Sequence, residues 1–252
     1  MAYYQTKGLT LIRRDWGETD RLFVIYTRDY GKLEVLAKGG KKTKSKLASH
    51  LEPFLLSEIL IAKGKSYDVL VGANSLYYFK NIWLDVFKTG LASYCLELIN
   101  LLTQPAQPER AVYELLVKTL HQLDQSKTED QVKSANLVRL FAWQLLNIAG
   151  YQPELHYCLA CQSQIQAGQN YFDANKGGLV CANCRTEGLI ALSDSAIKVL
   201  RLFLKKDIGD FTRLKIDGKL REEINQVVDG FVSAHLETKI QSLQFIKIGH
   251  EK

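Results

Sequence analysis

The sequence predicts an α+β protein of several domains, in which a five-stranded β-barrel of the OB-fold type precedes an α-helical domain with an inserted four-cysteine segment. Three observations predict this class. Short apolar runs separated by turn signals fill residues 1–75, apolar residues recur at helical spacing after Phe79, and four cysteines fall within one late segment. The predicted boundaries are 1–79 for the barrel, 80–150 and 189–252 for the two helical parts, and 151–188 for the cysteine segment.

The five expected strands follow one another with no long helical pattern between them, as in a small antiparallel barrel. In chain order they are GLTLI, RLFVIYT, KLEVLA, LEPFLLSEILIA and YDVLVGA. Pro53 lies in the fourth run, so this strand should begin near it or contain a bulge there. A barrel of this kind does not by itself imply a function.

Helical periodicity begins after the barrel. Residues 82–104 place apolar side chains at spacings of three and four, which predicts one amphipathic helix. Pro108 is placed to open the next helix, and Thr128 and Gly150 are expected to cap the N- and C-termini of a third. Ser193 is the expected N-cap of a later helix.

The composition is that of a folded protein, with 46% apolar and 24% charged residues. No apolar run approaches the roughly 20 residues that span a bilayer, and the N-terminal residues do not form a secretory signal, so we expect a cytoplasmic, nucleoid-associated protein. The net charge of +6 is uneven, because residues 1–80 carry 14 Lys and Arg against eight Asp and Glu, whereas the remaining residues carry 19 of each. A local surplus of this kind favours a polyanionic partner such as nucleic acid.

The late cysteines form two Cys-x-x-Cys pairs, Cys158 with Cys161 and Cys181 with Cys184, separated by nineteen residues. This spacing is typical of a four-thiolate zinc site, because each tight turn supplies two ligands to one tetrahedral ion. The intervening YFDANKGGLVC predicts a hairpin, so the segment should be zinc-ribbon-like and bind one structural Zn²⁺. Cys95 is expected to be a small core residue instead.

Patterns that would indicate an enzyme are incomplete. The His-x-Glu of a zinc deaminase occurs at His50, but the proline that should precede a cysteine pair is replaced by Tyr157 and Val180. Gly64-Lys65-Ser66 resembles the end of a phosphate-binding loop, but Ile59 stands where the motif requires glycine. We therefore predict no catalytic residues.

The densest positive charge is the run KGGKKTKSK, expected to link the third and fourth strands. Its lysines can contact phosphates, its glycines allow close backbone approach, and the aromatic residues Trp16, Tyr26 and Tyr30 are candidates for stacking on bases. The predicted DNA-binding residues are Arg13, Arg14, Arg21, Lys38, Lys41, Lys42, Lys44 and Lys46.

The order of these parts resembles the bacterial RecO family of DNA repair proteins, which are recombination mediators. The resemblance rests on the GE-x-D turn, the YG-K hairpin and the basic loop of the N-terminal region, on LEPFLLSEI, on LLNIAGYQPELHYCLAC, and on FDANKGGLVCANC. It covers essentially the whole chain. In the loop, lysines replace the arginines that relatives often carry, which keeps the charge but loses bidentate phosphate geometry.

The resemblance implies binding of single- and double-stranded DNA (ssDNA and dsDNA) with little sequence preference, and annealing of complementary strands. It also implies action with RecR and with the C-terminal tail of the single-stranded DNA-binding protein, and indirectly with the recombinase RecA. That tail should bind a basic-rimmed apolar groove, for which the helical candidates are Lys118, His121, Lys133 and Arg139. The residues alone leave two alternatives open: a nucleic-acid-binding protein of RNA metabolism or transcription, and a zinc hydrolase.

Overall fold

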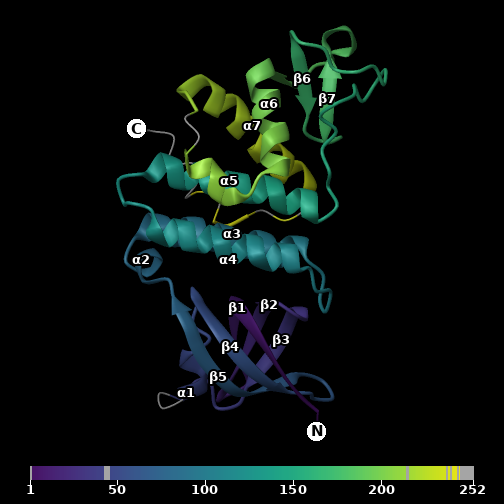
Figure 1. Cartoon of the computed structure of the whole chain (residues 1–252). Helices are drawn as coiled ribbons and strands as arrows, with labels where there is room; N and C mark the ends of the chain where they lie inside the picture. The colour runs from purple at the N-terminus through teal and green to yellow at the C-terminus, as the bar shows by residue number, and fades with distance from the viewer. Residues whose placement is uncertain are drawn as a thin grey trace.

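The computed structural model describes residues 2–42, 46–213, 216–236, 238, 240–242 and 244. Figure 1 shows a β-barrel at one end, two long helices lying across it, and a further helical layer that carries a small sheet at the opposite end. The barrel consists of β1 (Tyr3–Trp16), β2 (Asp20–Thr27), β3 (Gly31–Ala37), β4 (Leu55–Ala62) and β5 (Asp68–Tyr78), with α1 (Lys46–Ser49) between β3 and β4. The remaining elements are α2 (Lys80–Trp83), α3 (Val86–Leu102), α4 (Arg110–Gln125), α5 (Gln131–Ile148), β6 (Asn170–Asp173), β7 (Gly178–Cys181), η1 (Ala182–Cys184), β8 (Ile190–Leu192), α6 (Asp194–Lys205), η2 (Ile208–Arg213) and α7 (Gly218–His235).

The barrel closes in the strand order β1-β2-β3-β5-β4, so the predicted fold class is confirmed. β1 extends beyond the apolar run GLTLI because it pairs with two neighbouring strands. Its first half pairs with β4 and its second half with β2, and the register shifts between Thr10 and Ile12. β3 and β5 complete the closure as a short parallel pair. β4 begins just after Pro53, as expected.

The barrel contributes to two hydrophobic cores. Its interior is filled by a separate cluster that includes Phe23, Ile25 and Ile59. Leu9 and Tyr26 belong instead to the core of the helices, which also includes Phe79 after the last strand. β2 is therefore buried on both faces over Leu22–Thr27, with one face toward the barrel interior and the other toward the core of the helices.

The helical region departs from prediction at two points. The single helix expected over 82–104 is wrong, because α2 ends at Trp83 and α3 starts at Val86 after the N-cap Asp85, whose carboxylate accepts from two backbone N–H groups. The expected N-cap Thr128 is also wrong, since the residue before α5 is Asp130. Gly150 follows α5 with a φ of 96°, a conformation that suits glycine at a helix C-terminus.

The late elements follow the expected pattern with one addition. Ser193 caps α6 by accepting from the Ala196 N–H, and β6 and β7 form the predicted hairpin. β8 pairs with the other edge of β6 and was not predicted. Arg139 of α5 is buried in an ion pair with Asp229 of α7, with Nε–Oδ1 at 3.0 Å, and this pair joins the two helices. Within the described ranges, no helix has both the length and the apolarity to cross a membrane.

Candidate nucleic-acid interface and metal centre

The basic loop folds back on the β1–β2 hairpin at one end of the barrel. Gly39 adopts a φ of 66°, and a Cβ on Gly40 would lie 2.9 Å from the Ala37 carbonyl oxygen. The loop is fixed by backbone contacts, because the Lys41 N–H donates to the Thr19 carbonyl oxygen at 2.9 Å and the Gly39 N–H donates to Asp20 Oδ1 at 2.7 Å. The Gly39 N–H lowers the pKa of Asp20, with a smaller effect of the nearby lysines. The two glycines therefore let the loop pack closely on the hairpin.

Three of the predicted DNA-binding residues lie close together and are partly neutralised by carboxylates. Arg13 Nη1 lies 2.5 Å from Glu52 Oε2, and Arg21 lies between Asp15 at 3.7 Å and Glu52 at 3.8 Å. Lys41 Nζ donates to the Gly17 carbonyl oxygen and lies 3.4 Å from Asp15 Oδ2. The two acids come from the β1 end and from the segment after α1, and the sequence reasoning missed both.

Other predicted cations remain open to solvent. Arg14, Lys38 and Lys42 are exposed, and none makes an ion pair with another described residue. Lys44 lies outside the described residues, and Lys46 begins α1, with its side chain also outside the described part. The structure therefore brings together five of the eight predicted residues around one loop and hairpin, and places Arg14 on the β1 strand beside them.

The three candidate stacking aromatics have different surroundings. Tyr26 is fully buried in the core, and its hydroxyl donates to the Glu109 carbonyl oxygen, so the stacking hypothesis is wrong for it. Tyr30 packs on Tyr4 with ring centroids 4.5 Å apart. Trp16 is 42% exposed and contacts Tyr67, a residue of the β4–β5 hairpin that the sequence did not single out.

The four late cysteines converge in space. Their Sγ atoms all lie within 4.8 Å of one another, and those of Cys161 and Cys181 are 3.9 Å apart. Sulfurs bound at ~2.3 Å around a tetrahedral ion are separated by about 3.8 Å, so the group has the dimensions of a metal site. His156 is not part of the group, and its backbone N–H donates to Glu154.

The electrostatics of the cluster also favour a cation. Burial opposes ionisation of Cys158, but backbone N–H groups outweigh it and lower the pKa of this thiol to about 6. Hydrogen bonding to Cys161, and then to Cys181, raises the pKa of Cys184 to about 12. The four sulfurs cannot all carry negative charge this close together without a counter-ion, and a bound divalent metal removes that conflict. The described residues therefore form a group that can hold one metal ion.

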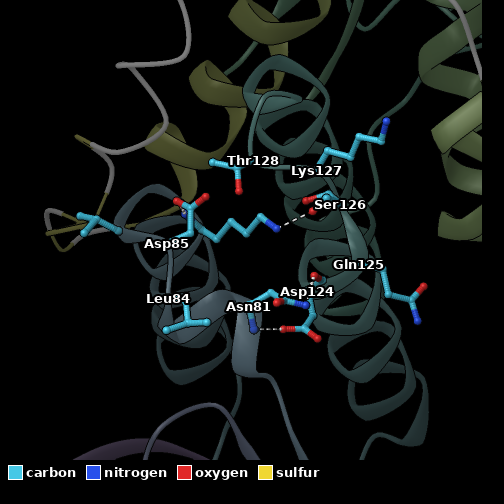
Figure 2. A pocket seen from close by; sticks show the side chains of 10 residues that line it. Asn81, Leu84, Asp85, Asp124, Gln125, Ser126, Lys127 and Thr128 are labelled. Carbon is cyan, nitrogen blue, oxygen red and sulfur yellow. Dashed lines mark hydrogen bonds between the residues drawn. The ribbon is translucent and has the colours of Figure 1, made fainter.

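A cavity of about 620 Å³ lies between α2, the start of α3 and the segment that leads from the end of α4 toward α5 (Figure 2). Its charged groups are already bonded within the protein. Asp124 Oδ1 accepts from the backbone N–H group of Asn81 (Figure 2). It also accepts from the Ile82 N–H, and Lys88 Nζ donates to the Ser126 carbonyl oxygen. Tyr77 at the end of β5 donates to the same Asp124 carboxylate. Asp124 therefore ties both the end of β5 and the start of α2 to α4, which gives this carboxylate a structural role.

The fold and its two sites define a class of protein: an OB-fold-like barrel with a cationic end, joined to a helical domain that contains a four-cysteine metal-binding group. The family model described as recombination protein O N terminal matches residues 1–79, and the model described as recombination protein O C terminal matches residues 84–244. The chain belongs to the recombination protein O family. This membership supports a part in DNA repair and recombination.

Curated relatives align along almost their full lengths. The chain is 32% identical to the DNA repair protein RecO of Dehalococcoides mccartyi strain 195, covering 96% of this chain and 94% of that protein. It is 29% identical to the DNA repair protein RecO of Thermoanaerobacter sp. strain X514, covering 98% of each chain. For the protein of the same name from Bacillus pumilus the identity is 28%, covering 96% and 93%.

Proposed function

We propose that this protein is a recombination mediator that binds ssDNA and dsDNA through the cationic end of its barrel, with little sequence preference. The observation that carries the proposal is the gathering of Arg13, Arg21, Lys38, Lys41 and Lys42 around one loop and hairpin, in a chain of this family. Contacts to phosphates are sequence-independent and release counter-ions, so the affinity should fall steeply with salt.

In this mechanism the barrel holds one strand by its backbone and leaves the base edges free to pair. A second strand, coated by the single-stranded DNA-binding protein, then anneals to the first. The protein acts with RecR, and both promote loading of the recombinase. The mechanism needs no nucleotide hydrolysis and no catalytic residue, because its chemistry is charge neutralisation.

A zinc ion is the proposed occupant of the cysteine group formed by Cys158, Cys161, Cys181 and Cys184. Four thiolates fill its tetrahedral coordination, so its role is structural. The predicted division of the chain at residues 79, 150 and 188 also remains a proposal.

The acidic tail of the single-stranded DNA-binding protein is proposed to dock in a groove of about 240 Å³ between α4, α5 and the end of α6. Leu115, Ile148 and Leu204 line it together with Lys118, Lys206, Glu114 and Asp207. Lys118 Nζ lies 2.5 Å from Asp207 Oδ2, whereas Lys206 is exposed and makes no ion pair with another described residue, so Lys206 is the cation offered to the tail. Of the four helical candidates, Lys118 alone lines this groove. Arg139 is excluded because it is buried against Asp229. Titration of a labelled tail peptide into wild type and a Lys206→Glu variant tests the groove, and equal affinities would contradict it.

The decisive experiment for the proposed function is strand annealing on DNA coated with the cognate single-stranded DNA-binding protein. The test variant replaces all five loop lysines with alanine. A control variant replaces five exposed lysines of the helical and cysteine-rich regions, namely Lys127, Lys133, Lys176, Lys198 and Lys219. We expect the loop variant to lose annealing and the control to retain it, although both lose the same charge.

Two other results would contradict the proposal. Wild-type affinity that does not change between about 50 and 200 mM salt would exclude phosphate contacts as the basis of binding. Preference for ssRNA over ssDNA in direct competition would instead favour the alternative of a protein of RNA metabolism.

A further inference from the structure

The two faces of the β1–β2 hairpin differ in charge and in chemistry. Successive side chains of a strand point to opposite faces, so Arg13 and Asp15 share one face, and Arg14 and Trp16 share the other. On the first face the cations are engaged by carboxylates, because Arg13 pairs with Glu52 and Asp15 pairs with Arg21. On the second face Arg14 is exposed without an ion pair among the described residues, and it lies two residues from an exposed tryptophan.

Trp16 is held against the β4–β5 hairpin. Its ring lies edge-to-face on Tyr67, with centroids 5.1 Å apart, and it remains 42% exposed. The hairpin is tight, because a Cβ on Gly64 would overlap the Tyr67 carbonyl oxygen, and the Gly64 N–H donates to Asp68 Oδ1 at 3.1 Å. Tyr4 also donates to Asp68, so this carboxylate is already hydrogen-bonded. Lys63 and Lys65 of the same hairpin are exposed.

The contact between Trp16 and Tyr67 therefore joins the β1–β2 hairpin to the β4–β5 hairpin. In barrels of this topology, these two hairpins flank the surface that binds oligonucleotides. An aromatic pair of an exposed Trp16 and a half-buried Tyr67, in hairpins that also carry exposed cations without ion pairs among the described residues, has the composition of a site for single strands, where bases stack and phosphates contact positive charge. A duplex keeps its bases stacked on each other and offers only its backbone to such a surface.

We propose that Trp16 and Tyr67 form a stacking platform for unpaired bases, with Arg14, Lys63 and Lys65 holding the adjacent phosphates, and that this platform makes the barrel favour single-stranded over duplex DNA. The inference rests on the proposed function. It adds the part of the ligand that is recognised, an unstacked base, and the residues that recognise it.

The test compares wild type with the Trp16→Ala/Tyr67→Ala double variant by fluorescence anisotropy at one salt concentration. The three probes have equal length: a single strand, a duplex, and a single strand with abasic sites. We expect the double variant to bind the single strand about 5- to 150-fold more weakly, the range for loss of one stacked base, and to bind the duplex within twofold of wild type. Wild type should discriminate against the abasic strand by a similar factor, a readout that needs no variant.

Two sets of control variants distinguish base stacking from phosphate binding and from a purely structural role of Trp16 and Tyr67. Arg14→Ala should weaken single-strand binding more than Arg13→Ala, because Arg13 is already paired with Glu52. A base stacked on Trp16 should also quench the intrinsic tryptophan fluorescence of the protein. Trp83→Phe removes another exposed tryptophan, in α2, and should leave both single-strand binding and this quenching unchanged, whereas Trp16→Phe should abolish most of the quenching.

Equal losses on single strand and duplex in the double variant would overturn the inference, since they indicate that the pair only braces the hairpins. Equal wild-type affinity for normal and abasic strands would also overturn it. Absence of any DNA binding by wild type would instead overturn the proposed function, so the two failures can be told apart.

Discussion

Removing the negative charge of Glu52 should strengthen DNA binding. Its two carboxylate oxygens lie 2.5 Å from Arg13 Nη1 and 3.8 Å from Arg21 Nη1, so it neutralises part of the cationic end. A phosphate bound to either guanidinium would lie about 6 Å from the carboxylate, where two like charges repel by about 0.7 kcal/mol at the dielectric constant of water. The groups are partly exposed, and we expect a gain of about 0.7–1.4 kcal/mol for Glu52→Gln, or about three- to tenfold in affinity.

The salt dependence gives a second measure of the same change. Each additional phosphate contact should steepen the slope of log K against log salt by about 0.7–0.9. The released Arg13 should therefore add about 0.7–0.9, whereas Arg21 remains beside Asp15. Folding stability should change little, because exposed ion pairs contribute about 0–1 kcal/mol. Anisotropy titrations at several salt concentrations and a thermal melt supply these numbers.

The control is Glu114→Gln, which raises the net charge equally but breaks a carboxylate–arginine pair on α4, with Arg110 Nε at 2.8 Å. It should leave DNA affinity unchanged. Arg13→Ala should weaken binding less in the wild type than in the Glu52→Gln background, where it should reverse much of the gain. Unchanged affinity in Glu52→Gln would refute the reasoning, because it would mean that neither arginine lies near the bound phosphates.

Four further outcomes are expected. Cys158→Ser should lose the single equivalent of zinc, measured by atomic emission, and make residues 151–192 sensitive to protease; full zinc retention would exclude Cys158 as a ligand. Burial raises the pKa of the Cys95 thiol well above its usual value, so after chelation four thiols should react with a disulfide reagent and Cys95 only on unfolding; rapid reaction of all five would show that it is accessible. Asp229→Ala should destabilise the protein by about 3–5 kcal/mol in urea unfolding because it leaves Arg139 buried without its carboxylate, and a loss below about 1 kcal/mol would contradict this. Asp124→Ala should cost about 1–3 kcal/mol by leaving the buried Ile82 N–H without its acceptor and the partly buried Asn81 N–H and Tyr77 hydroxyl without theirs, with a smaller loss for Asp124→Asn, and equal losses would argue against hydrogen bonding as the cause.

Local patterns in the sequence were sufficient where the structure depends on near neighbours. The cysteine spacing predicted the metal-binding group because two tight turns bring their own ligands together. Ser193 was recognisable as an N-cap because its oxygen bonds an N–H three residues away. The glycines of the basic run predicted close packing, and Gly40 lies against Ala37.

Features that depend on closure of the barrel could not be predicted in this way. Glu52 reaches Arg13 across 39 positions, and Trp16 meets Tyr67 only after β1 has bent around the barrel. The break between α2 and α3 was hidden because Trp83 and Phe87 are four residues apart, as they would be in one helix. Asp124 makes the break possible by accepting from the first backbone N–H groups of α2, a contact 42–43 residues distant in the chain.

The attachment of the barrel bears on how a bound strand would be released. The Lys32 ammonium donates to the Asn100 carbonyl oxygen at 2.7 Å, and Tyr26 donates to the Glu109 carbonyl oxygen at 3.2 Å. Leu9 and Phe79 lie in the same buried cluster as the residues of α3 and α4. Swinging the barrel away from the helices would break this shared core and expose apolar surface, so we do not expect domain opening to drive strand release. Annealing should then be limited by dissociation of phosphates from the cationic end, and its rate should rise with moderate salt before weakened binding reduces it.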